Sequence, residues 1–323
     1  MKADVILKEH GFDKDGKPLD WDGDPEVIPE SDLIPEELAS RAVDEYNKDK
    51  EKDVQIEVSE LHEVFENPFG SVNISVDEVG VKKQKENGRS KNSKKKEHKE
   101  YVRNTVIHVQ NGKGQYILNG LGVLGTLRIL AAFLLNNGLF NKATLLFFVD
   151  GARDLHSAIN TMFGWIPFRI ILDWYHLVEK CKMQLSLALK NRDMRNKVLE
   201  KVLAYLWVGK VDHAVKVLRD VDKNSIKNES AIDRLIGYFD RNYNYIPCYA
   251  LRKKLGLRIS SNRGEKANDL VVSDRQKHNG MSWSMGGSSS LASVITLHQN
   301  KEQFNWLLKR NIKFKLVEKE NVA

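Results

Sequence analysis

The chain has 323 residues, 41% of them hydrophobic, which is enough apolar content to bury the core of one large domain or two modest ones. Its formal net charge is +7, and residues 1–66 are acidic, so the positive charge is concentrated in the remainder. A basic excess of this kind favours a nucleic-acid partner over a merely solvated surface. No uncharged apolar window is long enough to span a membrane, and the first residues lack the layout of a secretory signal, so we expect a cytoplasmic globular protein.

The two cysteines, Cys181 and Cys248, are too few for a disulfide framework or a four-thiolate zinc site, and neither belongs to a C-x-x-C pair. Cys181 lies four residues after Leu177 and four before Leu185, which is the spacing of one helix face. We therefore expect Cys181 to be a packed core residue.

The chain is expected to begin with an acidic lead-in segment over 1–66, which is turn-rich and carries two short helical patterns at 35–47 and 57–66. From residue 71 apolar and polar residues alternate, which predicts a strand. Two further strand-like runs flank a Gly-containing turn at 111–114. Residues 71–118 therefore predict a three-stranded antiparallel meander.

A basic segment interrupts this meander. Residues 82–103 hold ten Lys or Arg against three Glu and show no apolar period, so we expect a long exposed loop. Its side chains could track nucleic-acid phosphates in a nonspecific, salt-sensitive manner, and a solvated loop tip is the alternative. The DNA-binding candidates in this segment are Lys82, Lys83, Lys94, Lys95 and Lys96.

The next segment alternates helix and strand. Residues 121–137 predict a mostly apolar helix ended by Gly138, and residues 142–150 predict a continuous apolar strand. Residues 155–164 predict a short helix, and residues 168–176 predict another apolar strand. This alternation indicates right-handed crossovers and parallel strand pairing.

An all-helical block follows over 177–258, where apolar residues recur at three- and four-residue steps. Residues 259–300 then open with a helix start and end with a second short helix. The pattern predicts an α/β fold, with elements over 67–176 and 259–300 on either side of the helical block and a basic tail over 301–323.

Two aspartates stand out in the strand patterns. Asp77 lies among apolar residues in the first strand, and an ionised, unpaired carboxylate is costly to bury there. A lysine partner or a bound divalent cation would compensate it, and both remain open. Asp150 ends a buried strand and is either the cap of the following helix or a second carboxylate at a shared metal site, because ligands gather at strand ends in α/β sheets.

Three further residues are candidates for the same site. Glu265 follows Asn262 by three positions, which is the spacing of a capping box. In the first turn of a helix packed on the sheet, Glu265 could instead supply a third carboxylate, and Mg²⁺ prefers such oxygen ligands. Asp173 and His176 form a D-x-x-H pair in which the carboxylate orients the imidazole, supports a metal site, or makes a plain structural pair.

Loops of the type G-x-x-x-x-G-K-[ST] and G-x-G-x-x-G do not occur in the sequence, and neither does a G-x-S-x-G elbow. Their absence argues against a P-loop or dinucleotide-binding protein and against a serine hydrolase of the α/β type.

Four segments in order carry a resemblance to a known family: SVDEVGV, FFVDGA, ILDWYH and, after the helical block, SSNRGEKANDLVVSDRQKHNGMSWS. Over about 71–297 the chain resembles the RNase H-like DDE transposases of bacterial insertion sequences, and its D-x-x-H pair is similar to that of the Mutator-like and related superfamily. The resemblance implies an RNase H-like mixed sheet flanked by helices, with an all-helical insertion before the last catalytic helix. It further implies that the segments 67–176 and 259–300 form one core.

The resemblance also implies a function, which is metal-dependent cleavage and strand transfer of DNA. Asp77, Asp150 and Glu265 would be the catalytic carboxylates and would bind two Mg²⁺ or Mn²⁺ ions, with Asp173 and His176 in support. Asp173 is an alternative to Asp150 as the second catalytic carboxylate. We prefer Asp150 because Asp173 already matches the first residue of the D-x-x-H pair. Arg275, Lys277 and Trp283 complete the DNA-binding candidates. Trp283 would stack on an unpaired base or wedge into a duplex, and plain packing of its indole is the alternative.

The implied partners are DNA, as element ends and as target, and further copies of the chain on that DNA. Such transposases commonly carry an N-terminal DNA-binding region, whereas residues 1–66 here are acidic and lack a cysteine pair. Two alternatives therefore stay open. One is a transposase-derived DNA-binding protein without catalysis, and the other is a structure-selective nuclease of the same fold.

Overall fold

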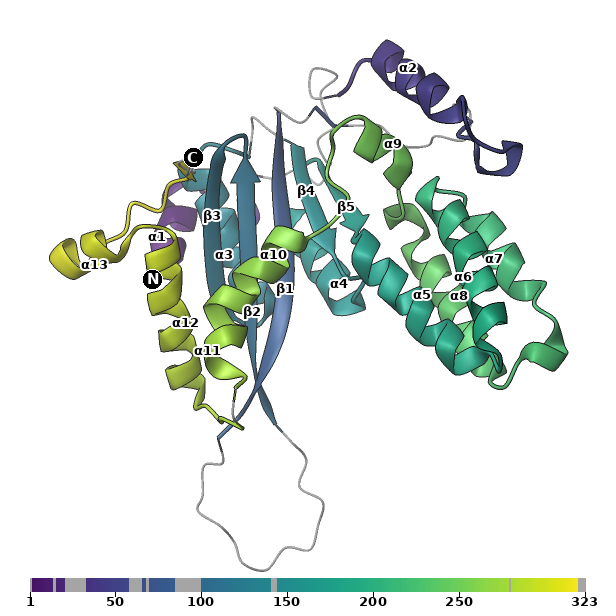
Figure 1. Cartoon of the computed structure of the whole chain (residues 1–323). Coiled ribbons are helices and arrows are strands. Elements are labelled where there is room, and N and C mark those ends of the chain that lie inside the picture. Colours follow the sequence, from purple (N-terminus) through teal and green to yellow (C-terminus); the bar gives the residue numbers. More distant parts are fainter. Residues whose placement is uncertain are drawn as a thin grey trace, which may run out of the picture.

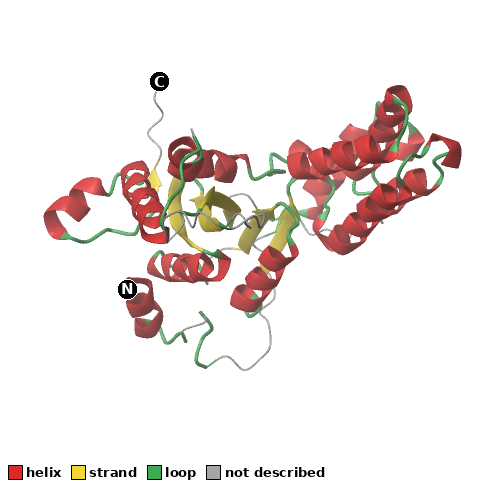
Figure 2. Cartoon of the chain, turned by 90° about the horizontal axis from the view of Figure 1, so that it is seen from below, coloured by secondary structure: helices red, strands yellow, loops and turns green. Residues whose placement is uncertain are grey.

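The computed structural model describes residues 2–13, 16–20, 33–57, 66–67, 70–84, 100–140, 144–278 and 280–318. At its centre these residues form a six-stranded mixed sheet with the order β5-β4-β1-β2-β3-β6. Helices cover both faces of the sheet, and a group of helices extends beyond its β5 edge (Figures 1 and 2). A mixed sheet of this kind is compatible with an RNase H-like fold.

The predicted meander is confirmed. Strands β1 (Ser71–Lys82), β2 (Tyr101–Asn111) and β3 (Gly114–Leu121) pair antiparallel in sequence order. The turn between β2 and β3 contains Gly112 at φ +54°, a left-handed conformation that favours glycine. The predicted loop between β1 and β2 falls largely on 85–99, which lie outside the described residues.

The predicted alternation of helix and strand is also confirmed. The elements are α3 (Val123–Asn136), β4 (Thr144–Val149), α4 (Arg153–Phe163) and β5 (Phe168–Leu172). Strand β4 lies between β1 and β5 and is parallel to both. The last strand is shorter than predicted: it stops at Leu172 because Asp173 caps the helix that begins at Trp174.

From Trp174 to Lys254 the regular elements are all helical. They are α5 (Trp174–Ala188), α6 (Arg192–Trp207), α7 (Val211–Arg219), α8 (Glu229–Asn242) and α9 (Tyr249–Lys254), with short 3₁₀ turns at Lys223–Ser225 and Tyr243–Tyr245. Cys181 is buried in the apolar core of these helices together with Leu177 and Leu185, which confirms its predicted packing role.

The chain then returns to the sheet. Its elements here are α10 (Asn262–Asn268), a π-helical turn (Asp269–Ser273), α11 (Asp274–Gln276) and α12 (Met285–Gln299). In Figure 1, α10 crosses β1 on the face opposite α3. The crossing is close because Gly264 has no side chain: a Cβ there would lie 2.6 Å from Cβ of Ser75 on β1.

The two ends of the chain differ from expectation. Helix α1 (Lys2–Glu9) was not predicted, yet it buries Ile6 and Leu7 in the core beside α3. Helix α2 (Glu36–Asn47) confirms the 35–47 pattern, whereas most of the predicted 57–66 helix lies outside the described residues.

The basic tail is more structured than its composition suggests. It carries α13 (Gln303–Lys309) and β6 (Val317–Glu318), and β6 adds to the sheet by pairing with β3. Among the described residues, helices long and apolar enough to cross a membrane are not found.

Candidate functional site

Three acids lie at one level of the sheet. Asp77, Asp150 and Asp173 belong to, or directly follow, the neighbouring strands β1, β4 and β5. Because these strands are parallel and in register, residues two positions beyond a paired set come to the same level. The paired residues that precede the three acids by two positions are Ser75, Phe148 and Ile171.

Asp77 is the most central of the three acids. Its carboxylate accepts a hydrogen bond from the side-chain amide of Asn268 on α10 and forms no ion pair with any residue that the structure describes. The expected alternative of a lysine partner is therefore not found within that part of the chain. Burial raises the pKa of Asp77, and the negative charge of Asp150 raises it further.

Asp150 is exposed at the carboxyl end of β4. Its Oδ1 accepts a hydrogen bond from the backbone N–H of Ala152 at 3.0 Å. The N-cap of α4 is Ala152 and not Asp150, so the helix-capping alternative is wrong. The backbone carbonyl of Asp150 accepts a hydrogen bond from the hydroxyl of Tyr238 on α8 at 3.1 Å, which ties this strand end to the helical group.

Asp173 is fully buried and both of its carboxylate oxygens are occupied. Oδ1 caps α5 by accepting the backbone N–H of His176 at 2.9 Å. Oδ2 accepts hydrogen bonds from the backbone N–H and the hydroxyl of Ser261, the hydroxyl at 2.9 Å. Burial acts to raise the pKa of Asp173, but these hydrogen bonds outweigh it and the pKa is lowered, so Asp173 stays ionised.

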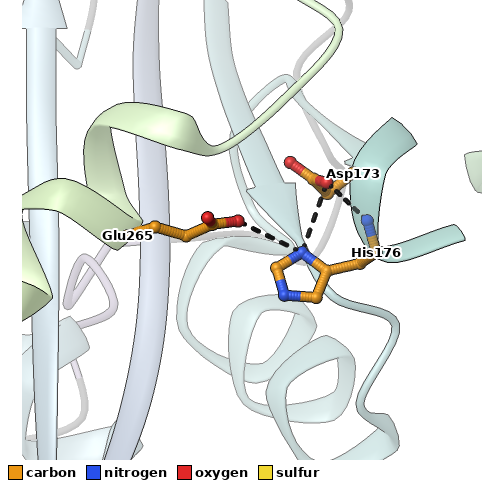
Figure 3. Close-up of side chains that lie close together, drawn as sticks. All are labelled: Asp173, His176 and Glu265. Carbon is orange, nitrogen blue, oxygen red and sulfur yellow. Dashed lines mark hydrogen bonds and ion pairs between the residues drawn. The ribbon is translucent and has the colours of Figure 1, made fainter. Parts of the chain in front are cut away.

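His176 joins two of the acids. Its Nδ1 lies 3.2 Å from Oδ1 of Asp173 and 3.5 Å from Oε1 of Glu265, as Figure 3 shows. The hydrogen bond to Asp173 raises the pKa of His176 to about 9, against an opposing effect of burial. At neutral pH the imidazole is therefore protonated, and it neutralises part of the negative charge around it.

Glu265 does not form the predicted capping box. The N-cap of α10 is Ser261, which makes no side-chain capping bond, and the Glu265 carboxylate points across to the imidazole of His176 (Figure 3). Burial raises the pKa of Glu265, His176 lowers it, and the charges of Asp173 and Asp77 raise it again. Glu265 is thus not a helix cap. Together with Asp77, Asp150 and Asp173 it makes up the group that we call the acidic cluster.

Two overlapping sets of ligands could hold a cation. Ligand atoms of Asp173, His176 and Glu265 lie within 4.8 Å of one another. A metal at Nδ1 of His176 would have to displace the proton that Asp173 stabilises, and both oxygens of Asp173 already accept hydrogen bonds. The ligand atoms of Asp77, Asp150 and Glu265 do not all lie within 4.8 Å of one another in this structure. These three residues offer only oxygens, and burial, followed by repulsion from neighbouring carboxylates, raises the pKa of Asp77 and Glu265, which suits a hard divalent cation.

The predicted DNA-binding residues fall at the far end of β1. Lys82 is exposed, and Lys83 forms an ion pair with Glu100 at 2.9 Å. Arg275 and Lys277 are exposed on and just after α11. Lys94, Lys95 and Lys96 lie outside the described residues.

Trp283 brings the α11–α12 connection to this end of β1. Its backbone N–H donates to the carbonyl of Lys82 at 2.9 Å, and its carbonyl accepts from the N–H of Gln84 at 2.8 Å. The indole packs beside the cluster that includes Val79, and its Nε1 donates to the carbonyl of Gln276 at 3.2 Å. These contacts give Trp283 a packing role.

Three site residues are not predicted from the sequence pattern. Asn268 lies one helical turn after Glu265, so i, i+3 spacing on α10 is a signal that could have found it. Ser261 and Tyr238 reach Asp173 and Asp150 from positions 88 residues away in the chain, and local spacing gives no signal for such contacts.

Comparison with known proteins finds no protein-family profile and no curated protein that matches this chain. One solved structure, the Drosophila P element transposase strand transfer complex, is similar at 10% sequence identity and a TM-score of 0.25, over 96% of this chain and 87% of that chain. A likeness at this level does not establish a shared family.

Proposed function

We propose that this protein is a divalent-metal-dependent enzyme that cleaves nucleic-acid strands and transfers their ends, a transposase of the DDE type. The proposal rests on one observation. The strand register brings Asp77 and Asp150 to one level of the sheet, and α10 crosses β1 closely at Gly264, which brings the neighbouring Glu265 to within 3.5 Å of His176 beside them. Carboxylates gathered in this way are costly unless a cation joins them.

Asp77, Asp150 and Glu265 would hold the cations, which would supply Lewis-acid stabilisation of the attacking and leaving oxygens at phosphorus. Asn268 fixes the carboxylate of Asp77 through its side-chain amide. The imidazole of His176 on α5 would hold the carboxylate of Glu265, which lies 3.5 Å from its Nδ1.

Asp173 is a positioning residue in this scheme. It holds His176 on one side and Ser261, at the start of α10, on the other. The D-x-x-H pair thus orients the helix that carries Glu265.

A nicking assay tests the proposal. Supercoiled plasmid or labelled duplex is incubated with Mg²⁺ and either the full chain or its Asp150→Asn variant, and we expect the variant to lose activity roughly a hundredfold or more. Asp154→Asn is a matched control, because Asp154 is exposed on α4 and lies outside the cluster. Equal nicking by the parent chain and Asp150→Asn would reject the assignment.

Strand transfer is tested separately with a target plasmid. A labelled 3′ end that becomes joined to the plasmid supports transposition chemistry. Nicking without joining would indicate that the protein is a structure-selective nuclease and not a transposase.

A further inference from the structure

A groove leads away from the acidic cluster into the helical group. It begins at Asp150 and His176, runs between α5 and α8, and has a volume of about 760 Å³. Along α5 it extends from His176 to Ser186, which is about 15 Å at the rise of an α-helix. A volume of this size is that of a site for a small ligand, so the groove would accept a few unpaired nucleotides and not a duplex.

The groove is acidic where it meets the cluster and basic beyond it. Lys180, Lys182 and Arg241 line it together with one carboxylate, that of Glu179, so its cations outnumber its acids beyond Asp150. Lys180 lies over the ring of Tyr238, with Nζ 5.5 Å from the ring centroid. Lys182 and Arg241 are exposed, and neither forms an ion pair with a carboxylate of a described residue. Both are therefore available to phosphate oxygens.

Tyr238, which lines the groove, is hydrogen-bonded to a residue of the acidic cluster. Tyr238 donates its hydroxyl to the carbonyl of Asp150, and burial raises the pKa of Tyr238 so that it remains a donor. Gly151 permits this contact, since a Cβ there would lie 2.8 Å from the Tyr238 hydroxyl. The basic groove is thus held at a fixed place beside Asp150.

One wall of the groove carries an apolar side chain open to solvent. Met183 lines the groove and is 48% exposed. An exposed apolar side chain beside cations offers van der Waals contact to an unpaired base while the cations neutralise its phosphates.

We propose that this groove binds an unpaired stretch of the nucleic-acid strand on one side of the cleaved phosphate, with Lys182 and Arg241 on its phosphates and Met183 against its bases. The inference rests on the proposed function, because it places the substrate of that same site.

Strand binding tests the inference without catalysis. Fluorescence anisotropy with a labelled single-stranded oligonucleotide is measured in EDTA over a series of salt concentrations. For Lys182→Ala/Arg241→Ala we expect roughly tenfold weaker binding and a salt slope smaller by about 1.4, since about 0.7 is lost per phosphate contact. Lys216→Ala/Arg219→Ala on α7 removes equal charge from exposed positions of the same helical group and should bind as the parent does. Equal weakening by both pairs would overturn the groove assignment.

A crosslink locates the strand. Met183→Cys introduces one accessible thiol, because Cys181 and Cys248 are both buried and burial raises the pKa of Cys181 to about 12. An oligonucleotide that carries a thiol-reactive disulfide should couple to Met183→Cys at least tenfold faster than to Val294→Cys, which is at an exposed position of α12 outside the groove. Equal coupling rates would contradict a bound strand in the groove.

The two proposals fail in different ways. If Asp150→Asn abolishes nicking while the groove pair binds and nicks as the parent does, the function stands and the groove is wrong. If the groove pair loses strand binding while Asp150→Asn still nicks, the groove binds nucleic acid and the catalytic proposal is wrong.

Discussion

Asp173 shows how one buried carboxylate organises a site without touching substrate. It accepts hydrogen bonds from His176 and Ser261, which belong to helices α5 and α10, and it is fully buried between them. A buried charge that is satisfied on every side keeps its partners in one arrangement, and removal of the charge leaves those partners without acceptors.

The pKa of His176 links this arrangement to stability. Its folded value of about 9 lies above the unfolded value of about 6.5, so the pair contributes stability in full below pH 6.5 and loses it as the pH rises through 9. We expect His176→Gln to be less stable than the parent at pH 6 in EDTA, and the difference to shrink by pH 10. Urea unfolding across this range measures it, and a difference that stays constant with pH would contradict the ion pair.

Glu265 and Asn262 show why local spacing misleads at a functional site. Their spacing fits a capping box, but the start of α10 is set by the contact of Ser261 with buried Asp173, and the Glu265 carboxylate turns to His176 instead. Tertiary contacts override the local preference, which the sequence cannot reveal.

At the scale of elements, the crossing of α10 over β1 decides where Glu265 and Asn268 lie. The helix approaches the strand at Gly264, where a Cβ would meet Cβ of Ser75 at 2.6 Å. Glycine at this position serves close packing and not an unusual backbone angle, because Gly264 is not among the residues of positive φ.

Gly264→Ala tests this crossing. The added methyl must push α10 away from β1, so we expect a loss of about 1–3 kcal/mol in the free energy of unfolding and reduced nicking, as Glu265 moves from the cluster. Gly286→Ala is the matched control, since Gly286 is also helical but has open space around it, and it should be neutral or slightly stabilising. Equal stability of the two variants would show that the contact is loose.

The elements themselves follow well from the sequence. The period-two pattern of 71–118 and the apolar strands ending near Asp150 and Asp173 predict the meander and the parallel pairs, and the register then brings the acids together. Helix α1 was missed because its eight residues are too few to show a clear apolar period, and its stability comes from packing on α3.

At the scale of the whole molecule, the sheet and the helical group meet at the acidic cluster. Asp77 lies in β1, and Asp150 and Asp173 directly follow β4 and β5. Helix α10, which lies across one face of the sheet, supplies Glu265, and α5 runs from the β5 edge into the helical group (Figure 1). Such a convergence of distant segments at strand ends is typical of ligand sites in α/β proteins.

Cation binding by the intact chain distinguishes the two overlapping ligand sets. Free Mn²⁺ is followed by electron paramagnetic resonance as the full chain or a variant is added. We expect saturable binding by the parent and by Asp154→Asn, at least tenfold weaker binding by Asp77→Asn and Asp150→Asn, and a smaller loss in His176→Gln, which keeps all three carboxylates but loses the contact that positions Glu265. Binding that survives in Asp77→Asn and Asp150→Asn but is lost in His176→Gln would place the ion on Asp173, His176 and Glu265 and contradict a carboxylate triad.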